Sequence, residues 1–140
     1  MSIRLAEPAW MPAIYALRRR VFVDEQQVPE ALEIDELDAT ATHLVVLLSG
    51  CLAGTLRWVP YPDAIKIGRV AVAAPLRRRG LGTALLQHAL TWAALHGVRQ
   101  VVLDAQLDSV GFYRRLGFVA EGDVFDDAGI PHVRMQRQFS

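Results

Sequence analysis

The chain has 140 residues and a formal net charge of zero, with 15 basic residues (Lys and Arg) against 15 acidic ones. This length fits one domain, residues 1–140, and the balanced charge argues against a nucleic-acid-binding protein, which usually carries a basic excess. Cys51 is the single cysteine, so neither a disulfide framework nor a paired-cysteine zinc site can form, and we expect no metal. No apolar run reaches the roughly 20 residues of a membrane span. We therefore expect a cytoplasmic protein that does not bind membranes.

The amino-terminal half predicts a strand, a helix and a β-hairpin, in that order. Residues 2–6 alternate as in a short strand, and residues 8–23 predict a helix because apolar side chains recur at helical spacing after a proline in the first turn. Pro29 and the acidic residues around it predict a loop or a short second helix. The apolar runs 44–48 and 52–59 flank a Ser-Gly turn, which is typical of an antiparallel hairpin.

The carboxyl-terminal half alternates strands with helices. Residues 64–73 predict a third strand of the hairpin set, residues 80–96 predict the clearest helix, and residues 98–104 predict a buried strand. The remaining predicted elements are a short helix over 108–116, a strand beginning at Phe118 and a strand over 133–139. A parallel crossover between strands 64–73 and 98–104 inside a mostly antiparallel sheet indicates an α/β (α+β) fold.

The strongest chemical signal is an arginine- and glycine-rich loop that opens directly into the clearest helix. It consists of Arg77, Arg78, Arg79, Gly80, Leu81, Gly82 and Thr83. The N–H groups in the first turn of a helix have no intrahelical partner, the helix dipole adds positive charge, and glycine lets a phosphate approach the backbone. The segment lacks the Gly-Lys-Ser/Thr of a P-loop and the GxGxxG of a dinucleotide fold. It predicts a phosphate site, with a structural turn as the alternative.

Several segments resemble the GNAT (GCN5-related) N-acetyltransferases. Arg77-x-x-Gly80-x-Gly82 after a Val-x-Val strand is similar to the family's acyl-CoA loop, and FYRRLGF at residues 112–118 resembles its tyrosine-helix segment. Three more segments resemble the ElaA-like branch, namely RVFVDEQ at 20–26, LDAQ at 103–106 and GIPH at 129–132. The resemblance covers nearly the whole chain. It implies a GNAT fold, with a mixed, mostly antiparallel sheet of six to seven strands flanked by about four helices.

The same resemblance implies acetyl-CoA as the co-substrate, with no metal. The pantetheine arm is then expected along the backbone of Val70, Ala71 and Val72, and the pyrophosphate at residues 77–83. Gln106 stands where many members of the family have asparagine. Glutamine can donate and accept in the same way, but its longer side chain changes the reach of the expected contact with CoA.

Tyr113 and Glu25 are the candidate catalytic residues. A thiolate leaves when an amine attacks a thioester, and the phenol of Tyr113 is the expected general acid, because thiol and phenol pKa values lie near about 8.5 and 10. Packing in the core is the alternative role. The amine must also lose a proton, and Glu25 is the expected base, directly or through a water, with a plain surface carboxylate as the alternative. Weaker candidates for the base are Asp35, Asp38, His43 and His132.

The segment 24–38 contains seven carboxylates and no Lys or Arg. It predicts a local negative potential, which the GNAT resemblance would place beside the acceptor and which would favour a cationic amine, with an ordinary solvated loop as the alternative. Further acidic residues that could add to this potential are Glu121, Asp123, Asp126 and Asp127. The expected function is acetyl transfer from acetyl-CoA to a small amine or a peptide amine, in a possible homodimer. The alternatives are a non-catalytic acyl-CoA-binding or regulatory module and an acyl-homoserine-lactone synthase-like enzyme, which RVFVDEQ also resembles.

Overall fold

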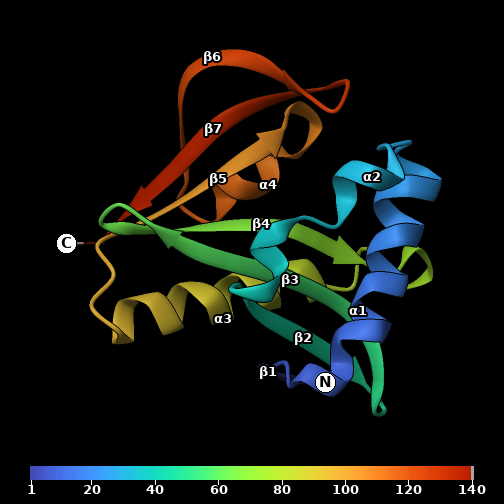
Figure 1. The fold of residues 1–140 in the computed structure, drawn as a ribbon. Coiled ribbons are helices and arrows are strands. Elements are labelled where there is room, and N and C mark those ends of the chain that lie inside the picture. The colour runs from blue at the N-terminus through green and yellow to red at the C-terminus, as the bar shows by residue number, and fades with distance from the viewer. Residues whose placement is uncertain (140) are drawn as a thin grey trace.

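Seven strands form one mixed sheet in the computed structural model, which describes residues 1–139 (Figure 1). The strands are Ser2–Leu5 (β1), Thr42–Leu48 (β2), Cys51–Tyr61 (β3), Ala64–Val72 (β4), Gln100–Gln106 (β5), Val119–Asp127 (β6) and Ile130–Gln138 (β7). Their order across the sheet is β1-β2-β3-β4-β5-β7-β6. Only β4 and β5 pair in parallel, and the other neighbouring strands of the described chain are antiparallel. The predicted parallel crossover is therefore confirmed.

Four α-helices and several shorter helical turns accompany the sheet within residues 1–139. The α-helices are Met11–Arg18 (α1), Glu30–Glu33 (α2), Leu81–Leu95 (α3) and Val110–Arg115 (α4). The 3-10 turns are Pro8–Trp10 (η1), Glu36–Ala39 (η3), Ala74–Leu76 (η4) and Leu107–Ser109 (η5). The predicted helix over 8–23 is present, but after α1 it continues as a π-helical segment, Arg19–Glu25 (η2). Such segments are rare and often accompany functional sites.

Helices cover both faces of the sheet because its central strands are apolar on both sides. On β2, Leu44 and Val46 belong to the largest core cluster with α3 and α4, whereas Val45 and Leu47 pack against α1. Successive side chains of a strand point to opposite faces, so a continuous apolar run serves two layers. Figure 1 shows α1 on one side of the strands and α3 on the other.

α3 is positioned by an apolar stripe and by a defined carboxyl end. Leu85 and Ala89 are among its fully buried residues. At its end, the N–H of Val98 donates to the carbonyl of Ala93 at 3.0 Å, and Gly97 has a φ of 74°. This arrangement is a Schellman motif, which needs a left-handed residue after the helix. It confirms the predicted stop at Gly97 and returns the chain to β5.

β4 and β5 separate halfway along their length. Ala64–Ile67 pairs with Gln100–Leu103, but beyond this point β5 pairs only with β7 and β4 only with β3. β4 also carries one extra residue opposite β3, near Arg69, whose φ is 51°. This β-bulge redirects the strand just past its last contact with β5. The result is an opening between β4 and β5, while β4 stays paired with β3 and β5 stays paired with β7.

A buried ion-pair network holds the segment that contains α2 and η3 against the sheet. Arg18 is only 1% exposed, and its guanidinium donates to Glu33 Oε1 at 2.6 Å and to Asp38 Oδ1 at 2.7 Å. Arg57 on β3 donates to Asp35 Oδ1 at 2.6 Å and to Asp38 Oδ1 at 2.8 Å. Burial by itself would raise the pKa of Asp38, but the hydrogen bonds and charges of Arg18 and Arg57 lower it to about 2. Each buried charge thus has a partner, as burial requires.

Replacing Arg18 by methionine is expected to lower the free energy of unfolding by about 3–5 kcal/mol, because buried Glu33 would lose its close cation and buried Asp38 would lose one of its two arginines. Chemical denaturation measures this change. Arg20→Met is the matched control, because Arg20 is exposed on the same helical segment, and we expect a change within about 0.5 kcal/mol. Equal losses in the two variants would contradict the role of the network.

The lowered pKa of Asp38 also predicts how stability depends on pH. A carboxylate with a depressed folded pKa stabilises the fold above its unfolded pKa, and this contribution is lost as pH falls from about 4 to about 2. The difference in unfolding free energy between the wild type and Asp38→Asn should therefore shrink over this range in urea titrations. Asp24→Asn, at an exposed position, should follow the wild type. If the difference in unfolding free energy between the wild type and Asp38→Asn stays constant with pH, the lowered pKa of Asp38 is contradicted.

Candidate functional site

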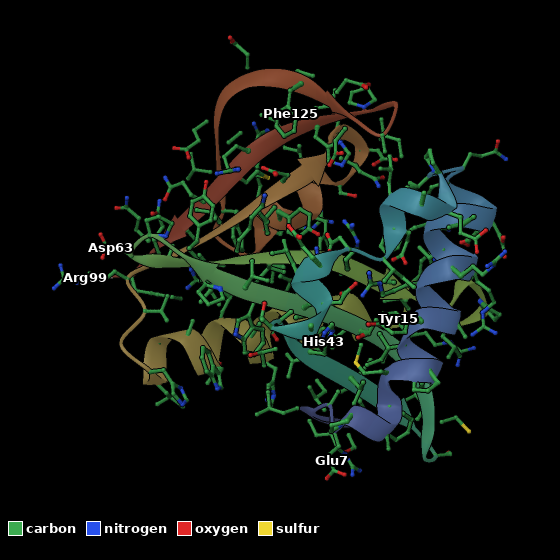
Figure 2. The ribbon with its side chains drawn as sticks, viewed as in Figure 1. Glu7, Tyr15, His43, Asp63, Arg99 and Phe125 are labelled. Atoms are coloured by element: carbon green, nitrogen blue, oxygen red, sulfur yellow. The ribbon has the colours of Figure 1, made fainter. Side chains whose placement is uncertain are left out.

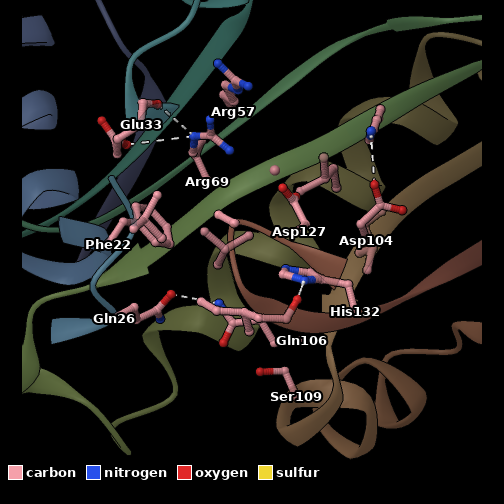
Figure 3. A pocket seen from close by; sticks show the side chains of 18 of the residues that line it. Phe22, Gln26, Glu33, Arg57, Arg69, Asp104, Gln106, Ser109, Asp127 and His132 are labelled. Atoms are coloured by element: carbon pink, nitrogen blue, oxygen red, sulfur yellow. Dashed lines mark hydrogen bonds and ion pairs between the residues drawn. The ribbon is translucent and has the colours of Figure 1, made fainter. Parts of the chain in front are cut away.

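A cavity of about 270 Å³ lies at the place where β4 and β5 separate (Figure 3). Gly68 and Val70 of β4 and Gln106 of β5 contribute to its wall. Other parts of the wall come from η2, α2, α4 and the turn between β6 and β7. The cavity therefore lies at the carboxyl ends of the parallel pair, which is where open α/β sheets bind their ligands.

Tyr113 on α4 reaches this cavity from the side of the sheet that carries α3. Its ring packs edge-on against Phe112 and Phe118, with centroid distances of 5.0 and 5.9 Å. The residue is only 9% exposed, and its hydroxyl has no protein hydrogen-bond partner among residues 1–139. Burial raises the pKa of the Tyr113 phenol to about 12. The phenol is therefore protonated at neutral pH and able to donate.

The arginine- and glycine-rich loop ends where α3 begins. Gly80 occupies the N-cap position with a φ of 78°, and no side chain within the described chain caps the helix. Leu81 is buried in the core, so only its backbone faces the loop, together with the backbone of Gly82 and Thr83. The side chains of Arg78 and Arg79 are exposed. The loop thus combines an uncapped helix start with two exposed arginines, and the phosphate site stays a prediction.

Arg77 is engaged with the protein itself. Its guanidinium binds both oxygens of Glu25, at 2.9 and 2.6 Å, and donates to the carbonyl of Val72 at 3.0 Å. These bonds tie the loop to the end of η2. Glu25 is exposed and is not part of the cavity wall. Its assignment as the base stays a prediction.

The other predicted contact residues lie close to the opening. Val70 is in the cavity wall, and Ala71 is buried beneath Leu17 and Val21 of the first helical segment. Gln106 Nε2 donates to Gln26 Oε1 at 2.7 Å, so a side chain of β5 is joined to the end of η2 (Figure 3). The sequence did not indicate Gln26 as a partner, because these residues are 80 positions apart.

The predicted negative potential of segment 24–38 is wrong. Five of its seven carboxylates are paired with arginines that come from other parts of the chain. The pairs are Glu25–Arg77, Glu30–Arg19, Glu33–Arg18, Asp35–Arg57 and Asp38–Arg18. The cavity wall itself carries three cations and three carboxylates, which are Arg57, Lys66, Arg69, Glu33, Asp104 and Asp127. Of the acidic residues predicted near the end of β6, Asp127 does lie in this wall.

His132 of β7 also points into the cavity (Figure 3). It is 9% exposed, and its ring stacks on Phe125 with centroids 6.0 Å apart. Its Nδ1 lies 2.7 Å from the carbonyl oxygen of Ile130. The sequence placed His132 below Glu25 as a candidate base. One sequence feature could have ranked His132 higher among the candidate bases. It lies just before the alternating strand 133–139, opposite the end of strand 98–104.

Among residues 1–139, the helices are too short or too polar to span a membrane.

Figure 2 shows side chains crowded between the strands and both helical layers. Arg99 and Asp63 lie at the end of the sheet away from the arginine- and glycine-rich loop.

Comparison with known proteins assigns the family. Residues 11–118 match the profile of the acetyltransferase (GNAT) family. YjcF of Bacillus subtilis, named an uncharacterized N-acetyltransferase, is 36% identical over 124 residues, which cover 88% of this chain and 89% of that protein. Protein ElaA of Escherichia coli is 31% identical over 131 residues, covering 90% and 86%.

Two crystal structures with similar sequences also share the fold over nearly their full length. That of ElaA has a TM-score of 0.87 at 28% identity and covers 98% of this chain and 99% of its own. That of an acyl-CoA N-acyltransferase from Pseudomonas aeruginosa has a TM-score of 0.86 at 33% identity and covers 97% of each chain. Profile, sequences and folds agree, so the chain belongs to the GNAT acetyltransferase family as an N-acetyltransferase of the ElaA-like type.

Proposed function

We propose that the protein transfers the acetyl group of acetyl-CoA to a primary amine by direct attack on the thioester, and that Tyr113 protonates the departing thiolate. The observation that carries the proposal is the buried phenol of Tyr113 in the cavity between β4 and β5. The acceptor is a small amine or a peptide amine. Acetyl-CoA supplies the activated acetyl group, and the chain supplies its binding site and the proton donor.

The residues around the opening fit CoA. β4 beyond Ile67 has no β5 partner, so backbone groups of Val70 on that edge are candidates to pair with an amide-containing arm, whereas the carbonyl of Val72 already accepts from Arg77. The uncapped first turn of α3 and the side chains of Arg78 and Arg79 suit the pyrophosphate. A Cβ built on Gly80 meets no atom within 4 Å, which supports an open approach to the backbone there. Arg77 is better suited to fixing the loop than to binding phosphate, because Glu25 already neutralises it.

Tyr113 can act as the acid even though burial raises the pKa of its phenol. A phenol with a pKa of about 12 is a weak donor to a free thiolate in water. The same burial that raises the pKa of the phenol also disfavours a charged thiolate in the cavity, so the pKa of the CoA thiol rises there as well. Because the two pKa values rise together, the phenol can still protonate the thiolate, and Tyr113 does not have to ionise in the resting enzyme.

Replacing Tyr113 by phenylalanine should lower kcat by about 10²–10⁴-fold and change acetyl-CoA affinity much less, because only the transferable proton is removed. Release of CoA thiol with a panel of primary amines measures the rate. Tyr61→Phe is the control, because it removes a hydroxyl from an exposed tyrosine on β3. Equal turnover by Tyr113→Phe and the wild type would make Tyr113 a packing residue. Binding of acetyl-CoA without turnover of any amine by the wild type would indicate a non-catalytic acyl-CoA-binding module.

Replacing Arg78 and Arg79 together by glutamine should weaken acetyl-CoA binding by about 10- to 100-fold, because two charge-assisted contacts to phosphate are lost. Titration calorimetry at low and high salt measures this, and the difference should shrink as salt screens the charges. The matched control is the double variant Arg4→Gln with Arg99→Gln, which also removes two positive charges but at exposed positions away from the loop. If both double variants bind equally well, the pyrophosphate does not lie at this loop.

A further inference from the structure

The ring of His132 is held in one orientation and has one free nitrogen. A carbonyl oxygen only accepts hydrogen bonds, so the 2.7 Å contact between Nδ1 and the Ile130 carbonyl requires the proton to be on Nδ1. In a neutral imidazole, Nε2 is then the acceptor. Nε2 has no protein partner among residues 1–139, and the residue is buried in the cavity wall. The ring of Phe125 lies beside the imidazole, with the two planes 24° apart.

The strand register places His132 and Tyr113 on opposite sides of the opening. Gln106 of β5 and Phe125 of β6 are the direct cross-strand partners of His132, so the three side chains share one face of the sheet. Val133 is the next residue on β7 and points to the other face, where it belongs to the same core cluster as Tyr113. The proton donor thus approaches from the α3 side, and the free nitrogen of His132 approaches from the α1 side.

We propose that His132 Nε2 is the general base that accepts the proton of the attacking amine, an assignment that rests on the proposed function. The amine nitrogen forms a bond to the thioester carbonyl carbon, and the C–S bond breaks with its electron pair moving to sulfur. His132 Nε2 takes one proton from the nitrogen, and the phenol of Tyr113 gives one proton to the sulfur. The imidazolium then returns its proton to the phenolate through solvent, so the products are the amide and the CoA thiol.

The other groups of the site are less suited to this role because they already have partners. Both oxygens of Glu25 are bound by Arg77, outside the cavity wall. Within the wall, Glu33 is paired with Arg18. Asp104 of β5 is paired with Arg134 at 2.6 Å, and with Lys66 at 3.1 Å.

Asp127 is in the same wall, but it is exposed to solvent and does not share the burial of His132. The charged and titratable groups that share the cavity with the imidazole are Asp127 on β6, Asp104 on β5, Lys66 and Arg69 on β4, Arg57 on β3, Glu33 on α2 and Tyr113 on α4.

The first experiment compares His132→Gln with Glu25→Gln and the wild type in kcat/KM profiles against pH. The amine used is the fastest of n-butylamine, benzylamine, spermidine and alanyl-alanine amide. We expect His132→Gln to lower kcat by about 10²–10⁴-fold and to lose the acidic limb that protonation of an imidazole produces. Acetyl-CoA affinity should change by less than about threefold, because His132 contacts the acceptor and not the CoA loop. His88→Gln, at an exposed histidine of α3, is the matched control and should behave as the wild type.

Two further measurements separate catalysis from packing. Added imidazole should partly restore the rate of His132→Ala, which it would not do if the ring only supported the hairpin. Long-range ¹H–¹⁵N spectra of the wild type should show His132 as the Nδ1–H tautomer. The proposal is overturned by the Nε2–H tautomer, by full activity of His132→Gln, or by an acidic limb that disappears in Glu25→Gln and persists in His132→Gln. If the wild type acetylates none of the four amines, the proposed function itself fails, which is a distinct result.

Discussion

The site depends on one interruption of backbone hydrogen bonding, the end of the β4–β5 ladder at Ile67 and Leu103. A gap inside a sheet normally leaves unpaired strand edges, which is unfavourable when they are buried. Here each strand keeps a partner on its outer side, β3 for β4 and β7 for β5. The opening is therefore lined by strands that are each held on one side, and the edge of β4 beyond Ile67 has no β5 partner.

The elements that complete the site are attached to this opening by polar contacts between distant segments. Gln106 joins β5 to η2, and Arg77 joins the arginine- and glycine-rich loop to the same end of η2. The carboxylates of segment 24–38 are used mainly to hold α2 and η3 in place. The wall of the cavity carries equal numbers of positive and negative side chains.

Much of the fold could be predicted from periodicity and turn residues, because these are local properties. The helix that ends at Gly97 and the parallel crossover through it followed from spacing alone. The π-helical segment after Arg18 and the bulge at Arg69 could not be predicted, because the residue pattern there does not differ from that of a regular helix and a regular strand. The arginine- and glycine-rich loop followed from its residues and the helix start after it, and the GNAT resemblance implied CoA at this loop and the role of Tyr113.

The charge balance of segment 24–38 could not be predicted for a related physical reason. Its acidic composition is visible in the sequence, but its partners Arg18, Arg57 and Arg69 lie on α1, β3 and β4. Asp35 and Arg57 are 22 residues apart in the chain, a distance at which sequence patterns carry no information on pairing. The role proposed for His132 likewise rests on features of the folded chain, namely the Ile130 carbonyl at Nδ1 and the cavity whose wall includes the imidazole.

The buried network around Arg18 also restricts how this sequence can diverge. Losing one member leaves an unpaired charge in the interior, whereas exchanging a whole buried ion-pair set for well-packed apolar residues is often neutral or stabilising. Arg18, Glu33 and Asp38 share hydrogen bonds, so the effects of substitutions at these positions are not additive. The three positions are therefore expected to be inherited as a unit. Related chains should either retain all three ionic residues or lack all three, with few intermediates between the two solutions.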